Sequence, residues 1–119
     1  MFRAKVVDKS VIFFCVGCNL EHAVNIDVTK NPKWVFNFNL NTPTLKPSVD
    51  IKSCNPDLSP ELEEEYDRIS ILPNGRNLVL NDPRFRTVCH SFIENGKIRY
   101  LPDCTHSYAG QTVELPAKY

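Results

Sequence analysis

The stretch that decides the fold is VCHSFIENGKIRYL, residues 88–101. Its two apolar arms flank Asn95-Gly96, and both of these residues tolerate the positive φ that a tight two-residue turn requires. The stretch therefore predicts a β-hairpin. Counting outward from the turn along both arms brings Cys89 near Cys104, which lies just beyond the open end. We expect the base of this hairpin to bring the two cysteines together.

Further β-strands are predicted on both sides of this hairpin. Segments that are rich in Val, Ile and Phe, or that alternate apolar with polar residues, predict strands over residues 2–7, 10–15, 23–28, 34–40, 48–52 and 112–115. Along 34–40, every second residue is bulky: Trp34, Phe36, Phe38 and Leu40. Because side chains alternate along a strand, we expect these four on one face, which packs in the core.

One helix is clearly encoded. Ser59 is a favourable N-cap, Pro60 suits the first helical position, and glutamates follow in the first turn, where they complement the helix dipole. These signals predict a helix over 59–70. Residues 75–81 form either a second short helix or a strand, and the pattern does not decide between them.

Composition bounds the class of protein. The chain has 119 residues, of which 42% are hydrophobic and 24% charged, as in an ordinary globular domain. Fourteen basic and fourteen acidic residues cancel, and no basic run exists, so nucleic acid is not expected as a partner. The apolar run 11–16 is much shorter than the roughly 20 residues of a membrane span and lacks the form of a signal peptide. We expect a soluble, cytoplasmic protein without a membrane partner.

The cysteines indicate a metal site. Five cysteines are an odd number, and in a reducing cytoplasm they are ligands or core thiols rather than disulfides. Cys15 and Cys18 form a C-x-x-C motif on a turn, from which both thiolates can reach one tetrahedral zinc ion. A redox dithiol has the same spacing but is normally followed by a helix. Residues 20–28 have a strand pattern instead, which favours zinc.

The rest of the zinc site is expected in the C-terminal third of the chain. The candidate ligands are His22, Cys54, Cys89, His90, Cys104 and His106. Hairpin geometry favours Cys89 and Cys104, with His106 as a substitute for Cys104. Cys54 has no such constraint, and a lone cysteine is commonly a small buried apolar residue.

The expected fold follows from these elements. It is an α+β fold, mainly β: a small zinc-clamped antiparallel sheet of β-hairpins with one short helical insertion. We expect a single zinc-binding domain over residues 1–119, with the insertion at about 55–82.

Strand alternation separates His90 from the metal. Cys89 and His90 point to opposite faces of the hairpin, so the imidazole is free to act as a general base. Such a base needs a nearby hydroxyl or thiol, and Ser48 is the best candidate. Asp50 or Asp103 can orient the imidazole. The alternative is that the histidine and the serine only satisfy buried polar groups.

Several motifs together resemble a known family. They are C-x-x-C at 15–18, Trp34, TPTLKPSV at 42–49, DPRF at 82–85, CHSFI at 89–93, NGKI at 95–98, DCTH at 103–106 and AGQTVELP at 109–116. Nearly the whole chain resembles small phage and prophage proteins of uncharacterised function, often mislabelled ammonia monooxygenase. Neither a membrane span nor a copper ligand set supports that label. The family is similar to the serine peptidase of bacterial ubiquitin-like conjugation operons.

This resemblance implies a function. It implies a zinc-stabilised hydrolase of phage type, in which Ser48 is the nucleophile and His90 the base. The enzyme would act in the host cytoplasm as a peptidase or deconjugase on a ubiquitin-like protein or another protein tail. The alternative is a non-catalytic, zinc-binding phage accessory or anti-defence protein that binds a host protein.

Overall fold

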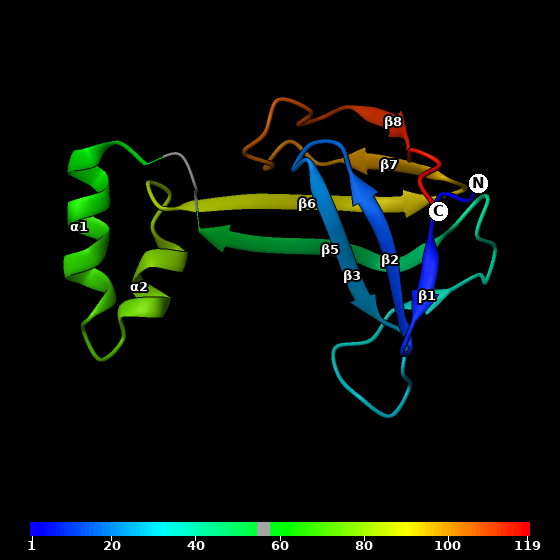
Figure 1. The fold of residues 1–119 in the computed structure, drawn as a ribbon, viewed down its shortest axis with the longest axis horizontal. Helices are drawn as coiled ribbons and strands as arrows, with labels where there is room; N and C mark the ends of the chain where they lie inside the picture. The colour runs from blue at the N-terminus through cyan, green and yellow to red at the C-terminus, as the bar shows by residue number, and fades with distance from the viewer. Residues whose placement is uncertain (55–57) are drawn as a thin grey trace. The chain divides into compact units, whose positions relative to one another are not determined.

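The computed structural model describes residues 1–54 and 58–119, which form two compact units (Figure 1). The first unit comprises Met1–Asp50 and Cys89–Tyr119 and contains two antiparallel β-sheets. The second comprises Ile51–Val88 and contains two helices. The mainly β class predicted from the sequence is confirmed.

A three-stranded sheet opens the first unit. Its strands are β1 (Lys5–Val7), β2 (Ser10–Cys15) and β3 (Leu20–Asn25), in the order β1-β2-β3. Alternate residues of β2 are buried, namely Val11, Phe13 and Cys15. The turn between β2 and β3 carries the C-x-x-C motif, so the strand that the sequence predicted after this motif is present.

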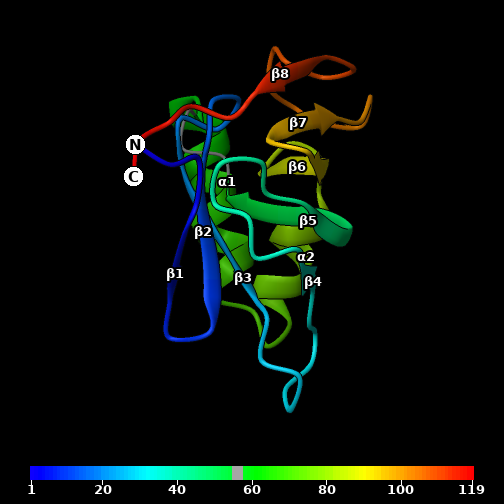
Figure 2. The ribbon, with the colours of Figure 1, turned by 90° about the vertical axis from the view of Figure 1, so that its right-hand side faces the viewer.

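A five-stranded sheet completes the first unit, and Figure 2 shows the two sheets side by side. Its strand order is β4-β5-β6-β7-β8, with bounds β4 (Val35–Phe36), β5 (Leu45–Cys54), β6 (Arg86–Glu94), β7 (Lys97–Tyr100) and β8 (Thr112–Glu114). The predicted hairpin is confirmed, because Glu94 pairs with Lys97 and both turn residues have positive φ, 50° at Asn95 and 80° at Gly96.

The five-stranded sheet buries one face and exposes the other. The buried side chains include Leu45, Val49, Ile93, Ile98 and Tyr100, and burial alternates along β7 and from Cys89 to Ile93 in β6. The residues between them are half-buried or exposed. Apolar burial on one face of a sheet is the main contribution to its stability.

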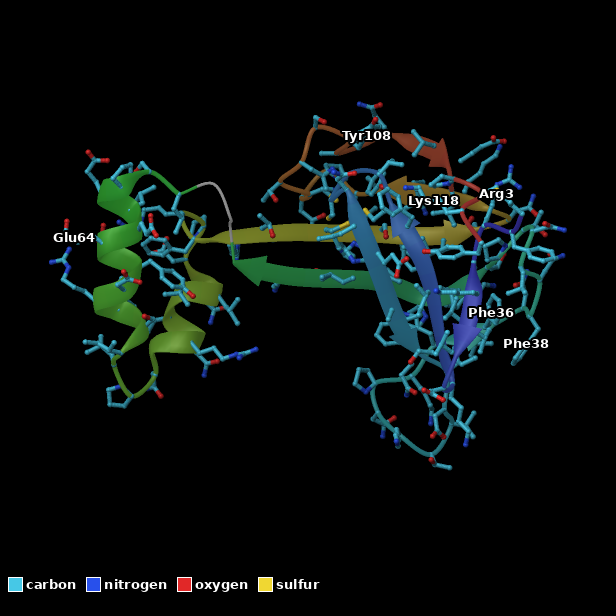
Figure 3. The ribbon with its side chains drawn as sticks, viewed as in Figure 1. Arg3, Phe36, Phe38, Glu64, Tyr108 and Lys118 are labelled. Carbon is cyan, nitrogen blue, oxygen red and sulfur yellow. The ribbon has the colours of Figure 1, made fainter. Side chains whose placement is uncertain are left out.

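The prediction for residues 34–40 is wrong in part. Only Val35 and Phe36 form a strand, and Phe36 is buried as expected. Phe38 is 74% exposed and adopts a φ of 57°, which ends the strand. Figure 3 labels both rings. The amide side chain of Asn37 binds the backbone at Asn39 and elsewhere in this loop, and such local bonds compete with a strand ladder.

The chain termini of the first unit are tied together. The backbones of Phe2 and Tyr119 exchange two hydrogen bonds. Arg3, labelled in Figure 3, donates from Nε to the carbonyl of Leu115 at 3.0 Å and from Nη1 to that of Asn41. These bonds join the segment before β1 to the segment after β8 and to the loop between β4 and β5.

The second unit is helical. Helix α1 (Pro60–Ser70) begins after Ser59, whose Oγ accepts from the backbone N–H of Leu62 at 3.3 Å, as the sequence predicted. Residues Gly75–Asn81 form helix α2 rather than a strand. The ring of Tyr66 in α1 contacts that of Phe85 edge to face. No helix in the described parts of the chain is long and apolar enough to span a membrane.

Candidate functional site

Ser48 and His90 meet on the exposed face of the five-stranded sheet. Ser48 lies in β5 and His90 in the neighbouring strand β6. The residues beside them, Val49 and Cys89, point to the buried face. Ser48 Oγ is 3.0 Å from Nε2 of His90, which is hydrogen-bond distance. The two residues singled out from the sequence are therefore brought together, although they lie 42 positions apart.

A carboxylate contacts the other nitrogen of this imidazole. Of the two candidates, it is Asp103 whose Oδ2 lies 3.2 Å from Nδ1 of His90. A carboxylate only accepts hydrogen bonds, so a neutral His90 carries its proton on Nδ1. Nε2 is then free to accept the hydroxyl proton of Ser48. This geometry is that of a nucleophile, a general base and an orienting acid.

Trp34 contributes a contact that sequence reasoning missed. Its indole Nε1–H donates to the backbone carbonyl of Ser48 at 3.2 Å. The alternating pattern around Trp34 indicated a core residue, and the ring is half-buried. No local signal connects it to a carbonyl in β5. The bond fixes the backbone of the serine from the side of β4.

A cluster of thiols and an imidazole lies on the buried side. The ligand atoms of Cys15, Cys18, His22 and Cys89 all lie within 4.8 Å of one another. The sulfur atoms of Cys15 and Cys89 are 3.7 Å apart, and the turn of the C-x-x-C motif brings the N–H of Cys18 to 3.4 Å from Cys15 Sγ. Three of the four predicted ligands thus lie together, and the fourth member of this cluster is His22.

A second group overlaps the first. It consists of Cys89, Cys104 and His106, again within 4.8 Å of one another. The base of the hairpin therefore does bring Cys89 and Cys104 together. Cys104 Sγ accepts from the backbone N–H of His90 and donates to its carbonyl, both at 3.2 Å. The side chain of Cys54 lies outside the described residues.

The four-residue cluster fits a metal ion. His22 is 5% exposed, and its Nε2 is buried without a hydrogen-bond partner among the described residues. A buried polar atom without a partner is costly, and coordination would satisfy it. Three sulfurs and one imidazole nitrogen are a common ligand set of structural zinc sites. In the described part of the chain, His106 Nε2 is also buried without a partner, and its ring packs against Gly17, where a Cβ would lie 2.4 Å from it.

The pKa values of the three thiols in the four-residue cluster shift in opposite directions. Hydrogen bonds from Cys18 and from Cys89 hold the pKa of Cys15 far below its ordinary value. The same contacts raise the pKa of Cys18 to about 11 and also raise that of Cys89. Burial raises the pKa of Tyr100, whose hydroxyl lies 3.2 Å from Cys15 Sγ. Cys15 is therefore the first thiol of the cluster to become a thiolate, the form that binds metals.

A comparison with models of protein families finds a match. The model of the family described as "Bacterial ubiquitination-like system serine protease (BubE)" matches residues 2–101. This range contains Ser48, His90 and the whole four-residue cluster, and it ends before Asp103. No curated protein and no solved structure matches the chain significantly.

Proposed function

The chain belongs to the family of serine proteases of bacterial ubiquitination-like systems, and from this premise we propose that Ser48 is its nucleophile and His90 its general base. The observation that carries the proposal is the 3.0 Å contact between Ser48 Oγ and His90 Nε2 on an exposed sheet face. Asp103 at Nδ1 completes a Ser-His-Asp arrangement, which recurs on unrelated folds.

The reaction is hydrolysis through an acyl-enzyme. Ser48 Oγ attacks the carbonyl carbon of the scissile bond while its proton passes to Nε2 of His90. The imidazolium, stabilised by the carboxylate of Asp103, then gives this proton to the departing amine as the carbon–nitrogen bond breaks. A water molecule, deprotonated by His90, attacks the ester, and its proton returns to Ser48 as the acid product leaves.

The proposed substrate is the C-terminal tail of a ubiquitin-like protein, either as a precursor or as a conjugate. The family supports a protein substrate of a ubiquitination-like system. An extended tail suits the site, because Ser48 lies on the open face of a sheet rather than in a deep cavity. If the gene has the phage setting that the sequence resemblance implies, the reaction would remove conjugates that the host makes.

We propose that the metal is a structural zinc ion held by Cys15, Cys18, Cys89 and His22. When bound, zinc would supply cross-linking of the hairpins, which contributes folding free energy. Cys89 directly precedes His90, so fixing the thiol also fixes the strand that presents the base. With Cys104 as the fourth ligand, as predicted from the sequence, the same strand would be held.

The experiment that tests this function is cleavage of a ubiquitin-like protein from the same kind of operon, fused through its C-terminus to a reporter. Ser48→Ala and His90→Ala should each abolish cleavage, while metal content and melting temperature stay nearly unchanged. Ser107→Ala is the matched control, because Ser107 is exposed and its hydroxyl has no role in the site. It should cleave at the rate of the parent.

A second outcome would replace the enzyme with a binding protein. If the parent and Ser48→Ala bind the ubiquitin-like protein equally and neither cleaves the fusion, the non-catalytic reading predicted as the alternative is correct. Chelation separates the metal from the chemistry, since it should lower the melting temperature of the parent and of Ser48→Ala by the same amount.

A further inference from the structure

The open face of the five-stranded sheet is organised in rows across the strands. Strand pairing places Val35 beside Lys46, Phe92 beside Arg99, and Arg99 beside Thr112. Strands β5 and β6 are neighbours and run in opposite directions (Figure 1). Since Ser48 contacts His90, moving two residues toward the Asn95-Gly96 turn on each strand brings Lys46 opposite Phe92.

The contacts at that turn hold the start of β5 against the end of β6, within one residue of this register. The N–H of Asn95 donates to Thr44 Oγ1 at 2.9 Å, and that of Gly96 donates to the carbonyl of Pro43 at 3.0 Å. Lys46, Phe92 and Arg99 therefore form one row directly beside the row of Ser48 and His90. We call these three residues the basic row.

The basic row carries positive charge that is not neutralised. Lys46 and Arg99 are exposed, and in residues 1–54 and 58–119 neither has a carboxylate at ion-pair distance. The guanidinium of Arg99 lies over the ring of Phe92, 4.5 Å from its centre. Stacking on an aromatic ring orients the guanidinium while leaving its N–H donors available.

The neighbouring rows carry different charges. In the row nearer the turn, Lys97 has Glu94 and Glu114 as its cross-strand neighbours, so this row carries one positive and two negative side chains. On the far side of the catalytic row, Asp50 follows Ser48 on the same face, and Asp103 contacts His90. The potential therefore changes from negative to positive across Ser48, toward the basic row.

The geometry points to an acidic substrate segment, and we propose that the basic row binds a Glu or Asp side chain two or three residues from the scissile bond. This inference rests on the proposed function of Ser48. Two residues of an extended chain span about 6.6 Å, which is also the spacing between rows on a sheet. A carboxylate would bind Arg99 and Lys46, and it would be repelled on the side of Asp50. The row thus also sets the direction of the substrate.

A binding experiment tests the row without requiring catalysis. Isotope-labelled Ser48→Ala protein is titrated with the peptide acetyl-Gly-Glu-Gly-Glu-Gly-amide and with its Gln twin, at low salt, and followed by NMR. We expect the Glu peptide to bind roughly tenfold more tightly, as two exposed charge contacts allow, and to shift the Nε–H signal of Arg99. Adding Arg99→Gln or Lys46→Gln should each lower this affinity about threefold.

Lys97→Gln is the matched control, because it removes an equal charge from the neighbouring row, where Lys97 lies between two glutamates. It should leave the preference for the Glu peptide intact. Equal binding of the two peptides, or an equal loss in Lys97→Gln, would overturn the proposal. A Glu preference in a protein that cleaves no fusion would support the basic row and reject the protease. Cleavage of the fusion without a Glu preference would support the protease and reject the binding of an acidic segment by the basic row.

Discussion

Single residues decide how well the nucleophile is held, and Trp34 is the clearest case. Its indole N–H donates to the carbonyl of Ser48. Trp34→Phe keeps most of the apolar contact and removes this bond, which is worth about 1 kcal/mol in a typical case. We expect kcat to fall about fivefold, which corresponds to that free energy, while KM and the melting temperature change little. Steady-state kinetics measures both constants, and an unchanged kcat would show that the bond does not position Ser48.

The fourth metal ligand is also a question about single residues. His22→Ala should weaken zinc binding at least about tenfold, because it removes a buried nitrogen that has no hydrogen-bond partner in residues 1–54 and 58–119. Cys104→Ser should keep the metal, since a hydroxyl can accept from the backbone of His90 and donate to it as the thiol does. Zinc competition with a chromogenic chelator gives both affinities. Loss of zinc in Cys104→Ser alone would restore the ligand set predicted from the sequence.

Some residues of the site were within reach of sequence reasoning, and others were not. Strand alternation predicts that His90 and Cys89 point to opposite faces. The two-residue turn at Asn95-Gly96 predicts the register of the β6–β7 hairpin. Hairpin counting favours Cys104 over His22. The approach of His22, in β3, to Cys89, in β6, joins residues that are distant in sequence. Long-range packing of this kind leaves no local pattern to detect.

At the scale of elements, the β6–β7 hairpin shows why turn chemistry is predictive. Gly96 has a φ of 80°, and a Cβ there would lie 3.2 Å from the carbonyl oxygen of Asn41 and 3.3 Å from Cα of Thr42. Gly96→Ala should therefore cost more than the roughly 1 kcal/mol of positive φ alone. Gly110→Ala is the matched comparison, because Gly110 has a φ of 77° and nothing within 4 Å of the added carbon.

Chemical denaturation of the two variants separates strain from crowding. We expect both variants to have a lower free energy of unfolding than the parent, and Gly96→Ala to be the less stable of the two. Equal losses would mean that the loop around Asn41 moves to accept the methyl group.

The segment 34–40 gives the opposite lesson about elements. Its alternation predicted a strand, but the asparagines beside Phe38 bind the backbone locally, and the strand ends at Phe36.

At the scale of the whole molecule, we expect the zinc-binding domain to fold without the helical unit. The residues proposed for catalysis and for zinc binding all lie in the first unit, and helix α1 has no buried residue. We propose that residues 55–82 are an insertion in a single zinc-binding domain. Deleting 57–80 and joining the ends by a short linker should leave the metal bound and unfolding cooperative, because loop length costs little entropy. Calorimetry and metal analysis of the deletion variant test this.

Loss of cooperative unfolding in that variant would show that the helical unit belongs to the core. Tyr66 and Phe85, whose rings are in contact, would then be the residues to examine.

The sequence predicted the helix itself well, through Ser59 and Pro60, because capping is local. It could not give the full lengths of β5 (Leu45–Cys54) and β6 (Arg86–Glu94), because strand length depends on pairing partners.

The central claim is that Ser48 is a nucleophile activated by His90. The most direct measurement is intact and peptide mass spectrometry of the metal-loaded protein after treatment with a fluorophosphonate, which reacts with activated serines. We predict one adduct per chain, located on Ser48, absent from His90→Ala and retained in Ser107→Ala. A parent protein that stays unlabelled, or one that is labelled at another serine, would contradict the account.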